Sequence, residues 1–175
     1  FEKGDGPSID GMIPTHADVK RLREVEPEES LSYVFDAVRK TWAGLRPDVP
    51  LIGFAGAPFT LASYIVEGGA SKNYRHTKAL MYGEPVAWHA MMSSISRSLV
   101  KYLNGQIAAG AQAVQVFDSW VGCLGPDDYR EFVLPYTQQV ISGVKPGVPV
   151  INFSTGTSSY LEIVSKAGGD VIGVD

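Results

Sequence analysis

A carboxyl group, a thiol and two imidazoles are the side chains of this sequence whose chemistry invites a catalytic role. Asp118 directly follows the apolar run AVQVF, and an acid at the end of a buried strand could serve as a general acid or base. Cys123 has no histidine or lysine near it in sequence to lower its pKa, which favours a buried, unreactive position. His76 and His89 lie thirteen residues apart, without an acidic or cysteine partner at metal-ligand spacing. The residues alone therefore predict no metal site and leave Asp118 as a candidate acid or base.

Four short and nearly continuous apolar runs predict the strands that would position such groups. They are residues 50–56, 113–117, 148–153 and 171–174. Continuous apolarity over so few residues is typical of strands buried on both faces, as in a parallel sheet. We expect any chemistry in the loops after these strands, because parallel α/β folds place their sites at the carboxyl ends of the strands.

The segments around these runs have helical spacing. Residues 30–45, 85–104, 127–140 and 158–167 carry apolar side chains at intervals of three and four. The alternation predicts an α/β fold, and both a doubly wound sheet and a (β/α)8 barrel fit it. The barrel is favoured because no GxGxxG or P-loop sequence opens a helix. Since both ends of the sequence break off abruptly, we expect residues 1–175 to form one incomplete domain. It would be a partial (β/α)8 TIM barrel of about four consecutive βα units, lacking N-terminal and C-terminal strands.

The composition is that of a folded protein, with 45% hydrophobic and 19% charged residues. A formal net charge of -4, spread along the chain, offers no basic surface for a phosphate backbone, so we expect no nucleic-acid partner. The sequence has no tract of about eighteen apolar residues, so we expect no membrane partner. Its single cysteine cannot form an internal disulfide, which favours a reducing, aqueous compartment.

Long stretches of the sequence resemble one enzyme family. GFAGAPFTLASYIVEGG at residues 53–69, SKNYRHTKALMY at 71–82 and GQIAAGAQAVQVFDSWVGCLGP at 105–126 closely resemble the uroporphyrinogen decarboxylases. LPY at 134–136 and the closing GGDVIGVD extend the resemblance over essentially the entire chain. The resemblance implies a barrel enzyme that decarboxylates the four acetate side chains of uroporphyrinogen to give coproporphyrinogen in haem and chlorophyll biosynthesis. It also implies that no metal, flavin or other cofactor is used.

The resemblance further implies three site residues. Tyr64 matches the family's tyrosine, whose phenol can donate to a substrate carboxylate or steady a neighbouring acid, so we expect it to be catalytic and substrate-binding. Ser119, in FDSW, matches a small hydroxyl residue that can donate to an acetate or propionate of the substrate. Phe54 resembles an apolar residue that lines the tetrapyrrole pocket, although a strand phenylalanine also suits a core. The family's essential aspartate belongs to an earlier strand, so Asp118 is expected to fix a neighbouring loop.

Three parts of the family's site have no counterpart in this chain: the essential aspartate, an arginine-bearing N-terminal segment and a histidine on a late strand. We therefore expect the chain alone to be inactive. The resemblance implies a homodimer in the cytoplasm, or in a plastid if the source is a photosynthetic eukaryote.

Two alternatives stay open. One is a cobalamin-linked methyltransferase of the same superfamily, which holds zinc through histidine and cysteine. The single cysteine and the absence of a His-x-Cys pair argue against it. The other is a non-catalytic tetrapyrrole-binding module, which the flanking sequence of the parent gene would test.

Overall fold

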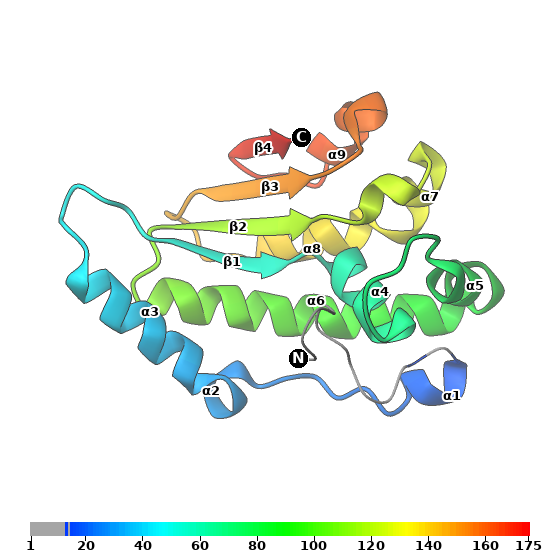
Figure 1. The fold of residues 1–175 in the computed structure, drawn as a ribbon, viewed down its shortest axis with the longest axis horizontal. Coiled ribbons are helices and arrows are strands. Elements are labelled where there is room, and N and C mark those ends of the chain that lie inside the picture. Colours follow the sequence, from blue (N-terminus) through cyan, green and yellow to red (C-terminus); the bar gives the residue numbers. More distant parts are fainter. Residues whose placement is uncertain (1–12, 14) are drawn as a thin grey trace.

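The computed structural model describes residue 13 and residues 15–175, and its described strands form one parallel sheet. The strands are β1 (Ile52–Gly56), β2 (Ala113–Asp118), β3 (Val150–Ser154) and β4 (Val171–Val174). They lie side by side in the order β1-β2-β3-β4, and each neighbouring pair is parallel (Figure 1). A barrel wall keeps the order of the sequence in this way, whereas a doubly wound sheet reverses direction at a switch point.

The order of the strands confirms the predicted α/β fold, a partial (β/α)8 barrel of four strands. All four predicted strands are present, with bounds that differ from the apolar runs by at most two residues at either end. The predicted single domain of residues 1–175 includes residues 1–12 and 14, which lie outside the described residues.

Helices precede and connect the strands. They are α1 (His16–Val19), α2 (Pro27–Ser30) and α3 (Ser32–Gly44) before β1; α4 (Pro58–Glu67), α5 (Arg75–Gly83) and α6 (Pro85–Ala108) before β2; η1 (Val121–Cys123), α7 (Pro126–Phe132) and α8 (Leu134–Gly143) before β3; and η2 (Ser158–Tyr160) and α9 (Leu161–Ser165) before β4. In this part of the chain, none of the helices has the length and apolarity needed to cross a bilayer.

Three predicted helical segments differ from the structure. Residues 158–167 form the 3-10 turn η2 and the short helix α9 instead of one helix. The helix predicted over residues 127–140 is divided into α7 and α8, which part at Val133. Pro135 explains the break, because its nitrogen has no hydrogen and its ring would clash with the carbonyl of Glu131 in a continuous helix. The helix predicted over residues 85–104 is α6, but α4 and α5 come before it in the same connection.

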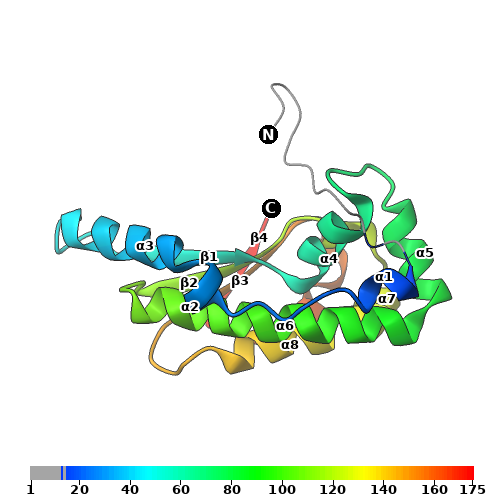
Figure 2. The ribbon, with the colours of Figure 1, turned by 90° about the horizontal axis from the view of Figure 1, so that it is seen from below.

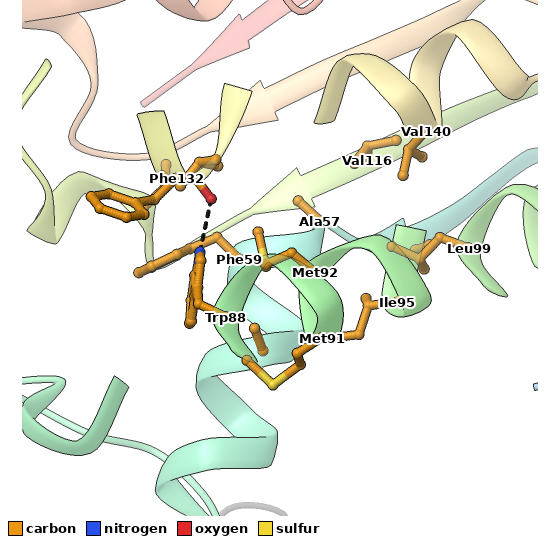
Figure 3. Close-up of a cluster of buried hydrophobic side chains, with 14 of the residues drawn as sticks. Ala57, Phe59, Trp88, Met91, Met92, Ile95, Leu99, Val116, Phe132 and Val140 are labelled. Carbon is orange, nitrogen blue, oxygen red and sulfur yellow. Dashed lines mark hydrogen bonds between the residues drawn. The ribbon is translucent and has the colours of Figure 1, made fainter. Parts of the chain in front are cut away.

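The core lies between the sheet and the helices along one of its faces. Figure 2 shows α6 and α8 on the same side of the strands. Val116 of β2, Met92 and Leu99 of α6 and Val140 of α8 belong to one cluster of buried side chains (Figure 3). The indole N–H of Trp88 donates to the carbonyl of Phe132 at 3.0 Å, which joins α6 to α7 inside this cluster. Each large apolar side chain buried here stabilises the fold by about 1.5–3 kcal/mol.

The opposite face of the sheet carries a row of aromatic rings, and we call this face the open face. Phe54, Phe117 and Phe153 follow one another across β1, β2 and β3 in edge-to-face contacts, with ring centroids 5.9 and 5.5 Å apart. Side chains alternate between the two faces of a strand, so the neighbouring Ala55 and Val116 are buried while Phe54 is 62% exposed. The core thus fixes the strands from one side and leaves Phe54 uncovered on the other.

Candidate active site

The carboxyl ends of the strands lie together at one edge of the sheet, which we call the C-terminal edge (Figure 1). The loops that leave β1, β2 and β3 are tied there through the main chain. The Ala57 N–H donates to the Phe117 carbonyl at 2.7 Å, and the Thr155 N–H donates to the Asp118 carbonyl at 3.2 Å. A Cβ atom on Gly122 would lie only 2.5 Å from the Thr155 carbonyl oxygen, so the second and third loops are in backbone contact. These main-chain contacts fix the three loops relative to one another, so their side chains are held in defined positions.

Tyr64 reaches the C-terminal edge from the second turn of α4 and stacks on the loop after β2. Its ring centroid lies 3.9 Å from that of Trp120, with 30° between the planes. Tyr74, the left-handed N-cap residue of α5 with φ 49°, lies 5.5 Å from the same indole. Among the described residues, no hydrogen bond occupies the Tyr64 phenol. The arrangement fixes the Tyr64 ring, and no other described residue takes up its hydroxyl.

Ser119 lies in the loop after β2 with its side chain exposed. Its main chain is held, because its carbonyl accepts a hydrogen bond of 2.7 Å from the Thr155 hydroxyl. Trp120, the next residue, is held by the Tyr64 ring and by a hydrogen bond from its main-chain N–H to the Thr60 hydroxyl at 3.3 Å. The Ser119 hydroxyl itself bonds to no other described residue, so it is presented on a fixed backbone.

Phe54 and Tyr64 line a cavity of about 390 Å³ beside the free edge of β1. Its walls are β1, α4, α6 and residues 22–31, and they are mostly apolar. Ser119 is not among the lining residues. The structure therefore brings Tyr64 and Phe54 to one cavity, and Tyr64 and the Ser119 loop into contact through Trp120, but it does not gather all three predicted site residues around one space.

Gln106 of α6 closes part of the free edge of β1. Its side-chain oxygen accepts from the Phe54 N–H at 3.0 Å, and its side-chain nitrogen donates to the Phe54 carbonyl at 2.9 Å. The amide thus satisfies the two backbone groups that a neighbouring strand would otherwise pair. Gly53 permits this approach, because a Cβ atom there would lie 2.8 Å from the Gln106 side-chain oxygen.

Asp118 is buried and points away from the open face. It is 3% exposed, and one of its carboxyl oxygens accepts a hydrogen bond of 2.8 Å from the Thr60 hydroxyl. The other oxygen has no partner among the described residues. Burial raises the pKa of Asp118 to about 7, against the opposing effect of the Thr60 hydrogen bonds. A carboxyl group in this position is suited to holding Thr60 and is shielded from solvent.

Cys123 lies near Asp118 and is half-buried. Burial raises the pKa of its thiol; Lys78, whose ammonium group donates to the Cys123 carbonyl at 2.9 Å, opposes this effect. Tyr129 and Tyr160 also face Asp118, and burial is the largest cause that raises the pKa of each phenol. The surroundings of Asp118 therefore disfavour negative charge.

The two histidines considered from the sequence lie apart from this edge chemistry. His89, on α6, is partly buried, and its Nδ1 lies 2.6 Å from the Tyr136 hydroxyl of α8. His76 is exposed on α5. Within residues 15–175, no group of three or more histidine, cysteine, aspartate or glutamate side chains is arranged to hold a metal ion.

Sequence reasoning missed the residues that tie the site together, namely Thr60, Trp120 and Thr155. The hydrogen bond between Thr60 and Trp120 spans 60 residues of sequence, and the one between Thr155 and Ser119 spans 36. Trp120 follows Ser119 directly in FDSW, and an aromatic residue at a strand end was a usable signal for a stacking partner. Nothing in the sequence distinguishes Thr60 or Thr155 from other hydroxyl residues.

Comparison with known sequences gives one consistent family. A family model described as uroporphyrinogen decarboxylase (URO-D) matches residues 1–175. The uroporphyrinogen decarboxylases of Carboxydothermus hydrogenoformans and Sorangium cellulosum are each 54% identical to the chain over all of its length. The one from Thermus thermophilus is 48% identical over 97% of the chain. The chain spans about half the length of these relatives.

Among solved structures, the chain is similar to a methyltransferase from Methanosarcina mazei. The TM-score is 0.65, and the match covers 79% of this chain and 40% of the other. The two are 22% identical in sequence. The similarity shows a shared fold and carries no argument about activity.

Proposed function

The chain belongs to the uroporphyrinogen decarboxylase family, and from this membership we propose that the protein containing it decarboxylates uroporphyrinogen to coproporphyrinogen in porphyrin biosynthesis. Identity of about 50% with several uroporphyrinogen decarboxylases over the whole chain is the observation that carries the proposal. Because the chain spans about half the length of these relatives, the activity is proposed for the complete protein, meaning this chain together with the flanking sequence that corresponds to the rest of the relatives.

The reaction replaces each of four acetate carboxyl groups by hydrogen. A pyrrole carbon next to the acetate is protonated, the carbon–carboxyl bond breaks to release carbon dioxide, and the methylene carbon then takes up a proton as the pyrrole loses its own. The protein must hold a substrate with several carboxylates and stabilise positive charge on the macrocycle. We propose that the reaction uses no metal, flavin or other cofactor.

Two hydroxyl donors at the C-terminal edge suit this task. We propose that Tyr64 donates to a substrate carboxylate as a catalytic residue and that Ser119 donates to an acetate or propionate. Support comes from the Tyr64 phenol, which no other described residue occupies and whose ring is fixed by Trp120, and from the exposed Ser119 hydroxyl on a main chain held by Thr155. Phe54 is proposed to contribute an apolar wall, because it is exposed and lines the same cavity as Tyr64.

We propose that sequence outside this chain supplies the remaining groups of the site, including an aspartate, an arginine and a histidine. It follows that residues 1–175 alone are inactive. The complete protein is proposed to be a cytoplasmic homodimer, with a plastid location if the source is a photosynthetic eukaryote, and without nucleic-acid or membrane partners. A half-buried single cysteine accords with a reducing compartment.

Neither alternative function gains from the structure. The methyltransferase similarity concerns the fold alone, and the described residues offer no cluster of soft metal ligands at the C-terminal edge. A non-catalytic tetrapyrrole-binding module would use the same hydroxyl donors, so turnover distinguishes it from an enzyme.

The test is to incubate the complete protein with uroporphyrinogen under anaerobic conditions, without added cofactor and in the presence of a metal chelator. The proposal expects carbon dioxide and coproporphyrinogen in a ratio of four to one, since four acetates are converted to methyl groups. Binding of the tetrapyrrole without release of carbon dioxide would instead support the binding module. Dependence of turnover on added zinc would favour the methyltransferase chemistry.

A further inference from the structure

Asp118 is an acid at the C-terminal edge that faces the helices instead of the open face. Along β2, Val114, Val116 and Asp118 are buried, while Gln115 and Phe117 alternate with them toward the open face. A carboxyl group that is buried on the helix side of the sheet is not exposed to a ligand above the strand ends. Burying a carboxyl group costs free energy, so the contacts of Asp118 must explain why it is placed there.

A short series of contacts connects Asp118 to Tyr64, one of the two proposed hydrogen-bond donors. The Thr60 hydroxyl donates to Asp118 at 2.8 Å and accepts from the Trp120 N–H at 3.3 Å. The Trp120 indole stacks on Tyr64 at 3.9 Å. Thr60 and Tyr64 lie four residues apart on α4, one turn from each other. One hydroxyl group thus links the end of β2, the Ser119 loop and the helix that carries Tyr64.

The acceptor role of the Thr60 hydroxyl toward the Trp120 main-chain N–H depends on Asp118. A threonine hydroxyl has a single hydrogen, and with Asp118 as its acceptor the lone pairs of the hydroxyl face the Trp120 N–H. Without an acceptor at Asp118, the hydroxyl is free to rotate and the Trp120 N–H competes with solvent for a partner. The Asp118 carboxyl therefore sets the direction of the bond that holds Trp120.

We propose that Asp118 and Thr60 are positioning residues for the decarboxylation. Together they fix the Ser119–Trp120 loop against α4 and so hold the Ser119 and Tyr64 hydroxyl groups at a fixed distance from each other. The proposal rests on the proposed function for the identity of the reaction, and on the hydrogen bonds for the positioning itself. Thr155 holds the same loop from the side of β3, through bonds to the Asp118 and Ser119 carbonyls.

A first test needs no turnover. Hydrogen exchange of the Trp120 amide is measured in the complete protein carrying Thr60→Val, Asp118→Val or Thr60→Ser. Loss of one hydrogen bond accelerates exchange by about fivefold to tenfold, and Thr60→Val and Asp118→Val should each do so, whereas Thr60→Ser keeps the hydroxyl and retains the protection. Equal protection in the wild type and in Thr60→Val would overturn the proposed contact. Protection retained in Asp118→Val would remove Asp118 from it.

A second test uses the reaction. Thr60→Val should lower kcat about tenfold, and combining it with Ser119→Ala should cost little more than the larger single effect, because both act through the same loop. Thr60→Ser should restore kcat. Effects of Thr60→Val and Ser119→Ala that multiply would contradict positioning through Ser119. If the wild type releases no carbon dioxide, the proposed function fails, while the amide exchange still decides whether Asp118 and Thr60 hold the loop.

Discussion

The C-terminal edge and the open face are built from opposite kinds of contact. At the C-terminal edge, Asp118, Thr60 and Thr155 hold the loops by directed hydrogen bonds of 2.7 to 3.3 Å. On the open face, Phe54 and Phe117 meet only through aromatic edges, and Phe54 is largely exposed. Hydrogen bonds fix the positions and directions of hydroxyl groups, whereas apolar rings are stabilised when other groups bury them away from water. We therefore propose that the chemistry takes place at the C-terminal edge and that the open face contributes an apolar surface, including the proposed Phe54 wall.

The same contrast explains the position of the apolar cavity. It lies beside the free edge of β1 and excludes Ser119, although it includes Tyr64. A site for a substrate with several carboxylates needs polar donors, which this cavity largely lacks. We infer that the cavity offers the substrate an apolar wall, formed in part by Phe54, while the Tyr64 hydroxyl supplies a polar donor.

The largest effect is expected at Asp118. Its pKa of about 7 in the folded protein lies above its ordinary value of 3.8, so the native state retains a proton that the unfolded chain releases. Stability of the wild type should therefore fall as the pH rises from about 4 to about 7 and level off above. Asp118→Asn should lack this pH dependence. Its unpaired amide hydrogens should lower the free energy of unfolding by the same amount at every pH. Denaturant unfolding of the complete protein should show the variant gaining on the order of 4 kcal/mol relative to the wild type over this range. A difference independent of pH would show that Asp118 is ionised throughout.

The next effect concerns the contact between the loops after β2 and β3. Gly122→Ala would place a Cβ atom 2.5 Å from the Thr155 carbonyl oxygen and 2.8 Å from the Gly156 Cα atom. Moving two backbones apart should lower the free energy of unfolding by about 2–3 kcal/mol and reduce turnover. Gly125→Ala is the matched control, because nothing lies within 4 Å of the added atom. Equal unfolding free energies for the two variants would mean that the loops are not in contact.

A smaller effect is expected from removing one donor. Tyr64→Phe keeps the ring that stacks on Trp120 and removes only the hydroxyl, so kcat should fall about tenfold without loss of stability. Tyr74→Phe is the control, since its ring also lies against Trp120 but its hydroxyl has no proposed role. Steady-state kinetics of the complete protein supply the comparison. Turnover of Tyr64→Phe equal to that of Tyr74→Phe would remove Tyr64 from the mechanism.

The smallest effect is expected on the open face. Residues 1–175 alone should associate, because the open face presents apolar rings and β1 has no neighbouring strand on its outer side among the described strands. Phe54→Ser should weaken the association severalfold in sedimentation equilibrium, whereas Tyr33→Ser, at an aromatic residue on α3 that is 67% exposed, should leave it unchanged. A monodisperse wild-type monomer would contradict this account of the open face.

The order of elements could be predicted from the sequence where the signal is local. Continuous apolar runs gave all four strands, since a strand buried by helices on one face and by a barrel interior on the other needs few polar residues. The apolar spacing in α6 correctly predicted burial of Trp88, Met92 and Leu103. It was wrong for Val86, which lies in the first turn and is 75% exposed. The break at Pro135 was also a local signal, but the apolar spacing on both sides of it outweighed it.

The candidate site residues came only from whole-motif resemblance. The resemblance indicated Tyr64, Ser119 and Phe54, and their roles remain proposals. The contacts around them could not be predicted, because Thr60, Asp118 and Thr155 come from three separate segments of the sequence that meet in the folded structure. A hydrogen bond between residues 60 positions apart leaves no periodicity and no spacing in a single sequence.

The central claim is that the substrate is held at the C-terminal edge by the Tyr64 and Ser119 hydroxyl groups. A crystal structure of the complete protein with coproporphyrinogen bound tests it most directly. The account predicts both hydroxyl oxygens within hydrogen-bonding distance, roughly 2.6–3.2 Å, of the tetrapyrrole or its carboxylates. A tetrapyrrole bound with both hydroxyl groups turned away from it would contradict the account.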